Sequence, residues 1–290
     1  MKRLTAIAMS AAILLGAATF ARGADGRTPP TDADYERHVA ALKKQLPSDE
    51  FHIVMARPFV VVGDESPEVV RRRAKNTVLW AVERLKKDFF TKDPDDIIDV
   101  WLFKDKESYE EHCEQLFGAK PHTPFGFYSS RHKALIMNIS TGGGTLVHEI
   151  VHPFMAANFP ECPSWFNEGL ASLYEQCGDN EGRIWGYTNW RLAGLQRAVD
   201  NRTVPPFERL CGTTTRQFYD EDRGTNYAQA RYLCHYLQEK GLLVDYYQEF
   251  RRSVDDDPTG YKTLVRVLGE EDMTAFQKEW EGYVNELRFP

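Results

Sequence analysis

The sequence predicts an α+β protein with a mixed α/β N-terminal half and a mainly helical C-terminal half. Two observations predict this class. Up to residue 139, short segments rich in Val, Ile and Phe alternate with amphipathic stretches. From residue 164 onwards, strand signals almost vanish and helical periodicity dominates. We therefore expect a mixed α/β half over residues 51–160 and a helical half over residues 161–290.

Each element of the first half follows from its own pattern. Strands are expected where β-branched and aromatic residues gather, at residues 52–62, 97–103, 126–129 and 134–139. Helices are expected where apolar residues recur every three or four positions, at residues 67–90 and 105–117. The last two strands flank a polar turn, so we expect them to form a pair.

The N-terminus has the pattern of a secretory signal peptide. Lys2 and Arg3 precede an apolar run over residues 4–20, and Ala21-Arg22-Gly23 is a plausible cleavage triplet. The run is Ala-rich and shorter than the roughly 20 residues that a membrane-spanning helix needs. We therefore expect residues 1–23 to be removed and the mature protein to be exported, periplasmic or extracellular, without stable membrane insertion.

Charge limits the partners of the mature chain. Removal of the signal peptide takes away three basic residues and no acidic one, so the formal net charge moves from −7 to −10. Such an acidic chain argues against nucleic acid and anionic membrane surfaces as partners. Residues 24–50 are polar and carry one short helical pattern, which indicates a lead-in segment docked on the domain behind it.

Five cysteines follow the signal peptide, and an exported chain could pair four of them. One pairing is disfavoured. Cys162 and Cys177 stand at the two ends of an expected helix and would lie about 18 Å apart, too far for a disulfide. The sequence leaves the pairing and the role of the odd thiol open.

The strongest chemical signal is His148-Glu149-Ile150-Val151-His152. Histidines four residues apart project from one face of a helix, so both imidazoles can bind one divalent ion. Zinc suits such ligands in a tetrahedral site that keeps one position for water. Glu149 points about 100° away from His148 and can reach that water without binding the metal. The alternative is a buried helix whose histidines are hydrogen-bonded core residues.

A catalytic zinc site needs a third protein ligand, and the following segment offers one. The position six residues after His152 holds Asn158, so the zinc-protease pattern with a third histidine is absent. Pro163 and Ser164 predict a helix start with Ser164 as N-cap, and Glu168 falls in the first turns of that helix.

The histidine pair and the segment Trp165-Phe166-Asn167-Glu168-Gly169-Leu170-Ala171 together resemble the gluzincin metallopeptidases, in particular the peptidase MA-like group related to thermolysin and aminopeptidase N. The resemblance covers residues 145–175 and, more weakly, residues 226–237. It implies a zincin-like fold in which an edge strand lies over the active-site helix, and the strand expected at residues 134–139 fits that place.

The resemblance also implies the roles of individual residues. One Zn²⁺ per chain would be held by His148, His152 and Glu168, and Glu149 would be the general base. Tyr227 matches loosely the tyrosine that stabilises the developing oxyanion, and its alternative role is that of a core aromatic. A peptide or protein substrate could bind by adding a strand beside residues 134–139.

Three departures from the family pattern lead to further expectations. Pro153 disfavours helical geometry at His152, so the motif helix is expected to kink or stop there. Ser172 stands where thermolysin-like enzymes carry an aspartate, so another group must orient a histidine. The strand Leu135-Ile136-Met137-Asn138 lacks the glutamate of the aminopeptidase signature, which favours an endopeptidase.

The expected function is therefore that of an exported zinc endopeptidase. Two alternatives stay open: a zinc amidase that acts on cell-wall or small-molecule amides, and a catalytically inactive zincin scaffold used for binding. The sequence does not indicate the cleavage preference or the oligomeric state.

Overall fold

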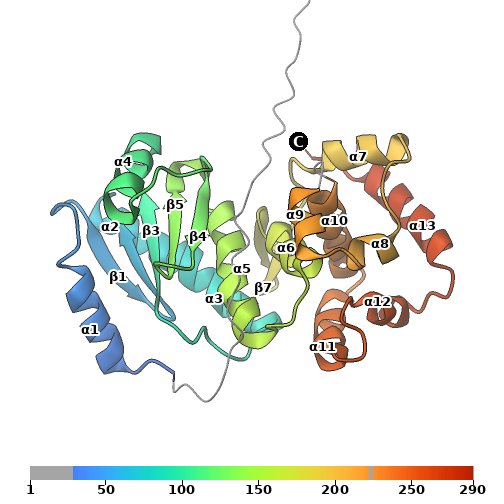
Figure 1. Cartoon of the computed structure of the whole chain (residues 1–290), viewed down its shortest axis with the longest axis horizontal. Helices are drawn as coiled ribbons and strands as arrows, with labels where there is room; N and C mark the ends of the chain where they lie inside the picture. Colours follow the sequence, from blue (N-terminus) through green and yellow to red (C-terminus); the bar gives the residue numbers. More distant parts are fainter. Residues whose placement is uncertain (1–28, 222–224, 290) are drawn as a thin grey trace, which may run out of the picture.

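The computed structural model describes residues 29–221 and 225–289, so the predicted signal peptide lies outside the described residues. Its N-terminal half is built on a five-stranded sheet with the order β1-β2-β3-β5-β4 (Figure 1). The strands are β1 (His52–Ala56), β2 (Phe59–Gly63), β3 (Ile98–Phe103), β4 (Gly126–Ser129) and β5 (Ala134–Asn138). β2, β3 and β5 run parallel, while β1 and β4 are antiparallel to their neighbours. The sheet is mixed, and the α+β class is confirmed.

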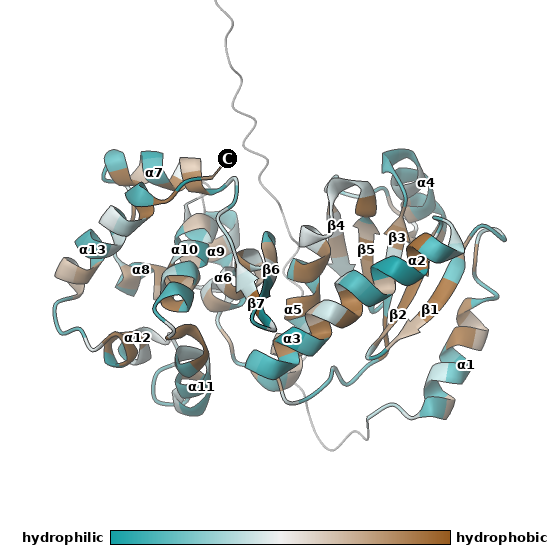
Figure 2. Ribbon diagram, turned by 180° about the vertical axis from the view of Figure 1, so that it is seen from behind, coloured by the Kyte–Doolittle hydropathy of each residue, from teal (hydrophilic) through white to brown (hydrophobic). Residues whose placement is uncertain are grey.

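The sheet is buried on both faces because helices cover each of them. Val61, Val100 and Leu135 form a cross-strand row that faces one long helical run and α5 (Gly144–Asn158). That run, expected at residues 67–90, consists of α2 (Pro67–Arg73), the π-helical segment η1 (Ala74–Leu79) and α3 (Trp80–Asp88). The solvent side of this run is hydrophilic, whereas the strands behind it are largely hydrophobic (Figure 2).

The opposite face carries α1 (Asp32–Leu42) and α4 (Lys106–Phe117). The lead-in helix α1 is fixed there by Tyr35, whose hydroxyl donates to the carbonyl of Pro58 at 3.1 Å. A second contact joins His38 Nε2 to Asp99 Oδ1 at 2.7 Å. The lead-in helix therefore docks on the domain behind it, as expected, and on the sheet face opposite to α5.

The structure corrects the expectations for two strands. The single strand expected at residues 52–62 is the antiparallel pair β1 and β2, because the chain reverses at residues 57–58. The strand at residues 134–139 is not an edge strand: β5 pairs with β3 on one side and with β4 on the other. Since β4 folds back on β5 as a hairpin, β4 becomes the edge, and β5 offers no free backbone to a peptide.

The C-terminal half is helical, as expected, with one exception. A small hairpin of β6 (Cys177–Asn180) and β7 (Arg183–Gly186) contradicts the expected lack of strands. Its turn places Glu181 and Gly182 at positive φ, which a tight hairpin turn requires. The helices that surround it are α6 (Ser164–Leu173), α7 (Leu192–Asp200), α8 (Phe207–Cys211), α9 (Thr215–Asp220), α10 (Asn226–Glu239), α11 (Leu243–Ser253), α12 (Tyr261–Leu268) and α13 (Met273–Glu286).

The central helix of this half is α10, which is buried along nearly its whole length and packs along α6. Gly169 permits the close approach, because a Cβ at this position would lie 3.0 Å from the carbonyl oxygen of Ala230. All five cysteines are free thiols. Within residues 29–221 and 225–289, no helix has the length and apolar character to cross a membrane.

Candidate metal centre

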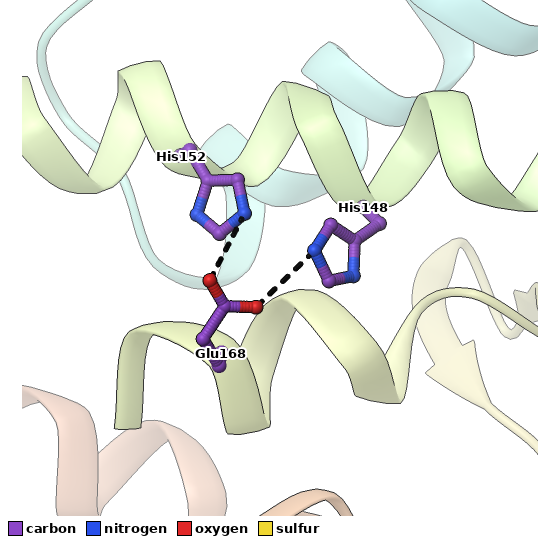
Figure 3. A group of neighbouring side chains, drawn as sticks. All are labelled: His148, His152 and Glu168. Atoms are coloured by element: carbon purple, nitrogen blue, oxygen red, sulfur yellow. Dashed lines mark ion pairs between the residues drawn. The ribbon is translucent and has the colours of Figure 1, made fainter. Parts of the chain in front are cut away.

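Two neighbouring helices bring together three side chains that could hold a metal ion (Figure 3). His148 and His152 project from α5, and Glu168 projects from α6 towards them. Nε2 of His148 lies 3.3 Å from Oε2 of Glu168, and Nε2 of His152 lies 3.8 Å from Oε1 of the same carboxylate. One ligand atom from each of the three residues lies within 4.8 Å of the other two. The spacing of the motif thus forms a cluster that could hold a metal ion.

The motif helix does not stop at Pro153, which corrects that part of the expectation. α5 continues to Asn158 with Pro153 inside it. Its neighbours Val151 and Phe154 are fully buried, so packing in the core outweighs the loss of one helix hydrogen bond. At the start of α6, Pro163 and not Ser164 is the N-cap, and the Ser164 hydroxyl donates to Thr215 at 3.1 Å.

Each histidine has a partner that orients its ring. Nδ1 of His152 donates to Oδ1 of Asn167 at 3.0 Å, which leaves Nε2 free to face Glu168. Nδ1 of His148 lies 3.4 Å from Oε1 of Glu175. Glu175 thus takes the place that sequence reasoning left open at Ser172, whose buried hydroxyl has no hydrogen-bond partner in the part of the chain that the structure describes.

Glu175 is itself held by two side chains. Arg191 donates to both of its carboxylate oxygens, at 3.1 and 2.8 Å, and the amide of Asn189 donates at 3.0 Å. Burial opposes ionisation of this carboxyl, but Arg191 and His148 together outweigh it, and the pKa of Glu175 falls to about 2. Glu175 is therefore a fixed anion beside His148.

Sequence reasoning missed three of the residues that surround the ligands. Asn167 directly precedes Glu168, and Glu175 follows it by seven residues, so their proximity in sequence was a usable signal. The third is Tyr219, whose hydroxyl donates to Oε1 of Glu168 at 2.7 Å. Tyr219 comes from α9, and nothing in its local sequence indicates this contact.

Tyr227 lies in the same neighbourhood. Its ring centroid is 6.2 Å from that of Tyr219 and 5.2 Å from the guanidinium carbon of Arg191. Burial raises the pKa of both phenols, so each keeps its proton at neutral pH. The structure thus places Tyr227 near the ligands, while the direct contact with Glu168 belongs to Tyr219.

Glu149, the expected general base, is only 1 % exposed, and its Oε2 has no hydrogen-bond partner among the described residues. Burial raises the pKa of this carboxyl, whereas the nearby histidines lower the pKa of Glu168. The carboxylates of Glu168 and Glu175 together raise the pKa of His148 to about 10 in spite of its burial. The two carboxylates therefore favour a positive charge at the position of His148.

The donor set fits a zinc ion. Nε2 of His148 and Oε2 of Glu168 are both buried without a hydrogen bond to any described residue, although they face each other across 3.3 Å. Two imidazoles and one carboxylate are ligands that zinc accepts. A divalent cation would satisfy these atoms and offset the excess of buried carboxylates.

A cleft with a volume of about 1000 Å³ opens onto His148 and Glu149. One wall is formed by η1 and the first residue of α3, through Asn76, Thr77 and Trp80. The others are formed by β4 and the loop before it, by the glycine-rich residues 141–145 and by residues 190–197. An extended chain could enter this cleft and place a bond beside Glu149.

Comparisons with known proteins identify no family for this chain. No protein-family profile matches the sequence, and a search of curated proteins found no significant match.

Proposed function

We propose that this protein is an exported zinc-dependent peptidase of the gluzincin type, most simply an endopeptidase. The observation that carries the proposal is the position of Glu149: a buried carboxyl without a partner on Oε2, adjacent to a cluster of two histidines and one glutamate, on the wall of a cleft. A purely structural metal site has no use for such a group. The sheet, the motif helix and the edge strand β4 are compatible with a zincin-like arrangement, and residues 1–23 support export.

His148, His152 and Glu168 would hold the zinc ion, which when bound supplies Lewis-acid polarisation of the scissile carbonyl and makes a water more acidic. Glu149 accepts the proton of the attacking water, because its raised pKa makes it a stronger base than an exposed carboxylate. It then delivers the proton to the leaving amine. Tyr219 contacts Glu168, and the ring of Tyr227 lies 6.2 Å from that of Tyr219, so one of these two protonated phenols would donate to the developing oxyanion.

The surrounding side chains keep these groups in place. Asn167 and Glu175 fix the orientation of the two imidazoles, and Tyr219 fixes the carboxylate of Glu168. The substrate would be a peptide or protein in extended conformation. Since β5 is paired on both sides, the free edge of β4 is the strand on which such a peptide can dock.

The substitution Glu149→Gln tests the proposal. It keeps the shape of the side chain, so zinc binding is expected to persist, while hydrolysis of a peptide library should fall by a factor of about 100 to 10,000. Retained turnover would remove Glu149 from the role of general base. Hydrolysis of peptidoglycan fragments but not of peptides would favour the amidase, and bound zinc without any hydrolysis would favour the binding scaffold.

A further inference from the structure

The cleft wall carries few charged side chains, and they differ in whether another side chain neutralises them. Within the described chain, the acidic residues that line it are Glu149 and Glu175, and the arginines are Arg191 and Arg197. Glu175 and Arg191 neutralise each other in a buried ion pair at 2.8 Å. Glu149 lies beside the histidines at the inner end. Apart from the cluster around His148, the remaining charge on the wall belongs to Arg197.

Arg197 is exposed, and its guanidinium has neither a hydrogen bond nor an ion pair with any residue that the structure describes. Its Nη2 lies 3.8 Å from the place that a Cβ on Gly194 would occupy. Gly194 precedes Arg197 by three residues on α7, and long helical side chains lie back over that position. Since Gly194 also lines the cleft, the guanidinium lies along the cleft wall and is not directed away from the protein.

We propose that Arg197 binds a carboxylate of the substrate, so that the peptides hydrolysed by this protein carry an acidic side chain or a free C-terminus on the α7 side of the scissile bond. This inference rests on the proposed peptidase function and adds a substrate class to it. A guanidinium binds a carboxylate through two parallel hydrogen bonds, which gives direction as well as charge.

Two further observations favour an anionic group at this place. The part of the wall formed by Asn76, Thr77 and Trp80 carries no charge, so these side chains do not compete for Arg197. The full chain carries a net charge of −7, and loss of the three basic residues at positions 2, 3 and 22 would make it −10, so an unpaired cation inside the cleft is the feature that would let an acidic peptide approach. Trp190, which is 52 % exposed on the same wall, adds an apolar surface for the rest of the peptide.

The test compares matched peptides that differ only in charge. Each pair carries Asp or Asn, or Glu or Gln, at one position, with either a free or an amidated C-terminus, so that the two sources of the carboxylate are separated. The wild-type protein is expected to prefer the charged member about tenfold in kcat/KM at low ionic strength, and the preference should shrink as salt rises. Arg197→Gln should abolish the preference.

Arg252→Gln is the matched control, because Arg252 is an exposed arginine on α11 outside the cleft, and its loss changes the net charge equally. It should keep the wild-type preference. A preference that survives Arg197→Gln, or that is lost equally in the control, would overturn the inference.

Binding separates this inference from the proposed function. Fluorescent peptides of the same pairs can be titrated onto the Glu149→Gln variant with and without Arg197→Gln. Charge-selective binding that depends on Arg197, when the wild-type protein with its full zinc content hydrolyses none of these peptides, would refute the peptidase and keep the carboxylate site. Hydrolysis without charge selectivity would do the reverse, and the absence of binding by every peptide would refute the carboxylate site.

Discussion

Replacement of Gly144 by alanine should damage both the fold and the metal centre. Gly144 is the first residue of α5, four positions before His148. A Cβ on Gly144 would lie 1.9 Å from the carbonyl oxygen of Glu175. The obstacle is backbone, so no side chain can rotate out of the way.

The size of the effect follows from that distance. The gap must grow from 1.9 Å to at least 3.0 Å, so α5 and the chain at Glu175 have to separate by more than 1 Å. Forcing an extra carbon into a packed site of this kind costs about 3 kcal/mol. The same shift would pull Glu175 away from His148, which now lies 3.4 Å from it, and should weaken zinc binding at least tenfold.

Urea unfolding and zinc titration measure the two effects. The urea midpoint should fall by about 1 M, since the slope for a chain of this size is on the order of 3 kcal/mol per M. Gly143→Ala is the matched control: its Cβ would meet Thr77 at 3.4 Å, an ordinary contact, and stability should stay within about 1 kcal/mol of the wild type. Equal behaviour of the two variants would refute the close approach of α5 and Glu175.

Four other substitutions test the surroundings of the site and the core. Glu175→Gln should weaken zinc binding 10- to 100-fold in a competition titration, because His148 loses its anionic partner, whereas Glu161→Gln on the exposed loop should not. Tyr219→Phe removes the hydrogen bond to the carboxylate ligand and should weaken zinc binding about tenfold. Tyr227→Phe should leave the affinity for zinc unchanged and lower kcat. If instead Tyr227→Phe weakened zinc binding and Tyr219→Phe lowered only kcat, Tyr227 would hold the ligand and Tyr219 would stabilise the oxyanion. Burial lowers the pKa of His235 from 6.5 to about 4, so the unfolded chain binds a proton first. Stability is therefore complete above pH 6.5 and falls by about 3 kcal/mol as the pH drops to 4. His235→Gln should flatten this part of the curve of unfolding free energy against pH, and an unchanged slope would show that His235 is not its source.

Much of the fold is predictable because the strongest signals are local. The strands β3, β4 and β5 and the helix over residues 67–88 carry clear periodicity, and the structure has each of them close to the expected bounds. Strand order is a different matter. Whether β5 lies at the edge of the sheet depends on which strand of the β4–β5 hairpin pairs with β3. The sequence of the hairpin contains no signal for that choice.

The site divides in the same way. The cluster of His148, His152 and Glu168 follows from helical spacing and a short connection, so sequence reasoning could assemble it. Tyr219 contacts the site because α9 packs beside it, and Arg191 does so because the segment before α7 packs there. No local sequence pattern predicts these two contacts. The proline rule failed at Pro153 because burial of the helix in the core outweighed local propensity. The hairpin over residues 177–186 is a different case: only Ile184 and Gly186 in it are buried, and it depends on the tight turn at Glu181 and Gly182.

The division of the ligands between α5 and α6 has a consequence for any attempt to cut the protein in two. A boundary at residues 160–161 separates the histidines from Glu168, and α6 is packed along α10. A fragment that ends there contains the recognisable motif but cannot complete the ligand set. Tight zinc binding would then require both fragments to reassociate, so the affinity for zinc would measure how strongly the two fragments associate.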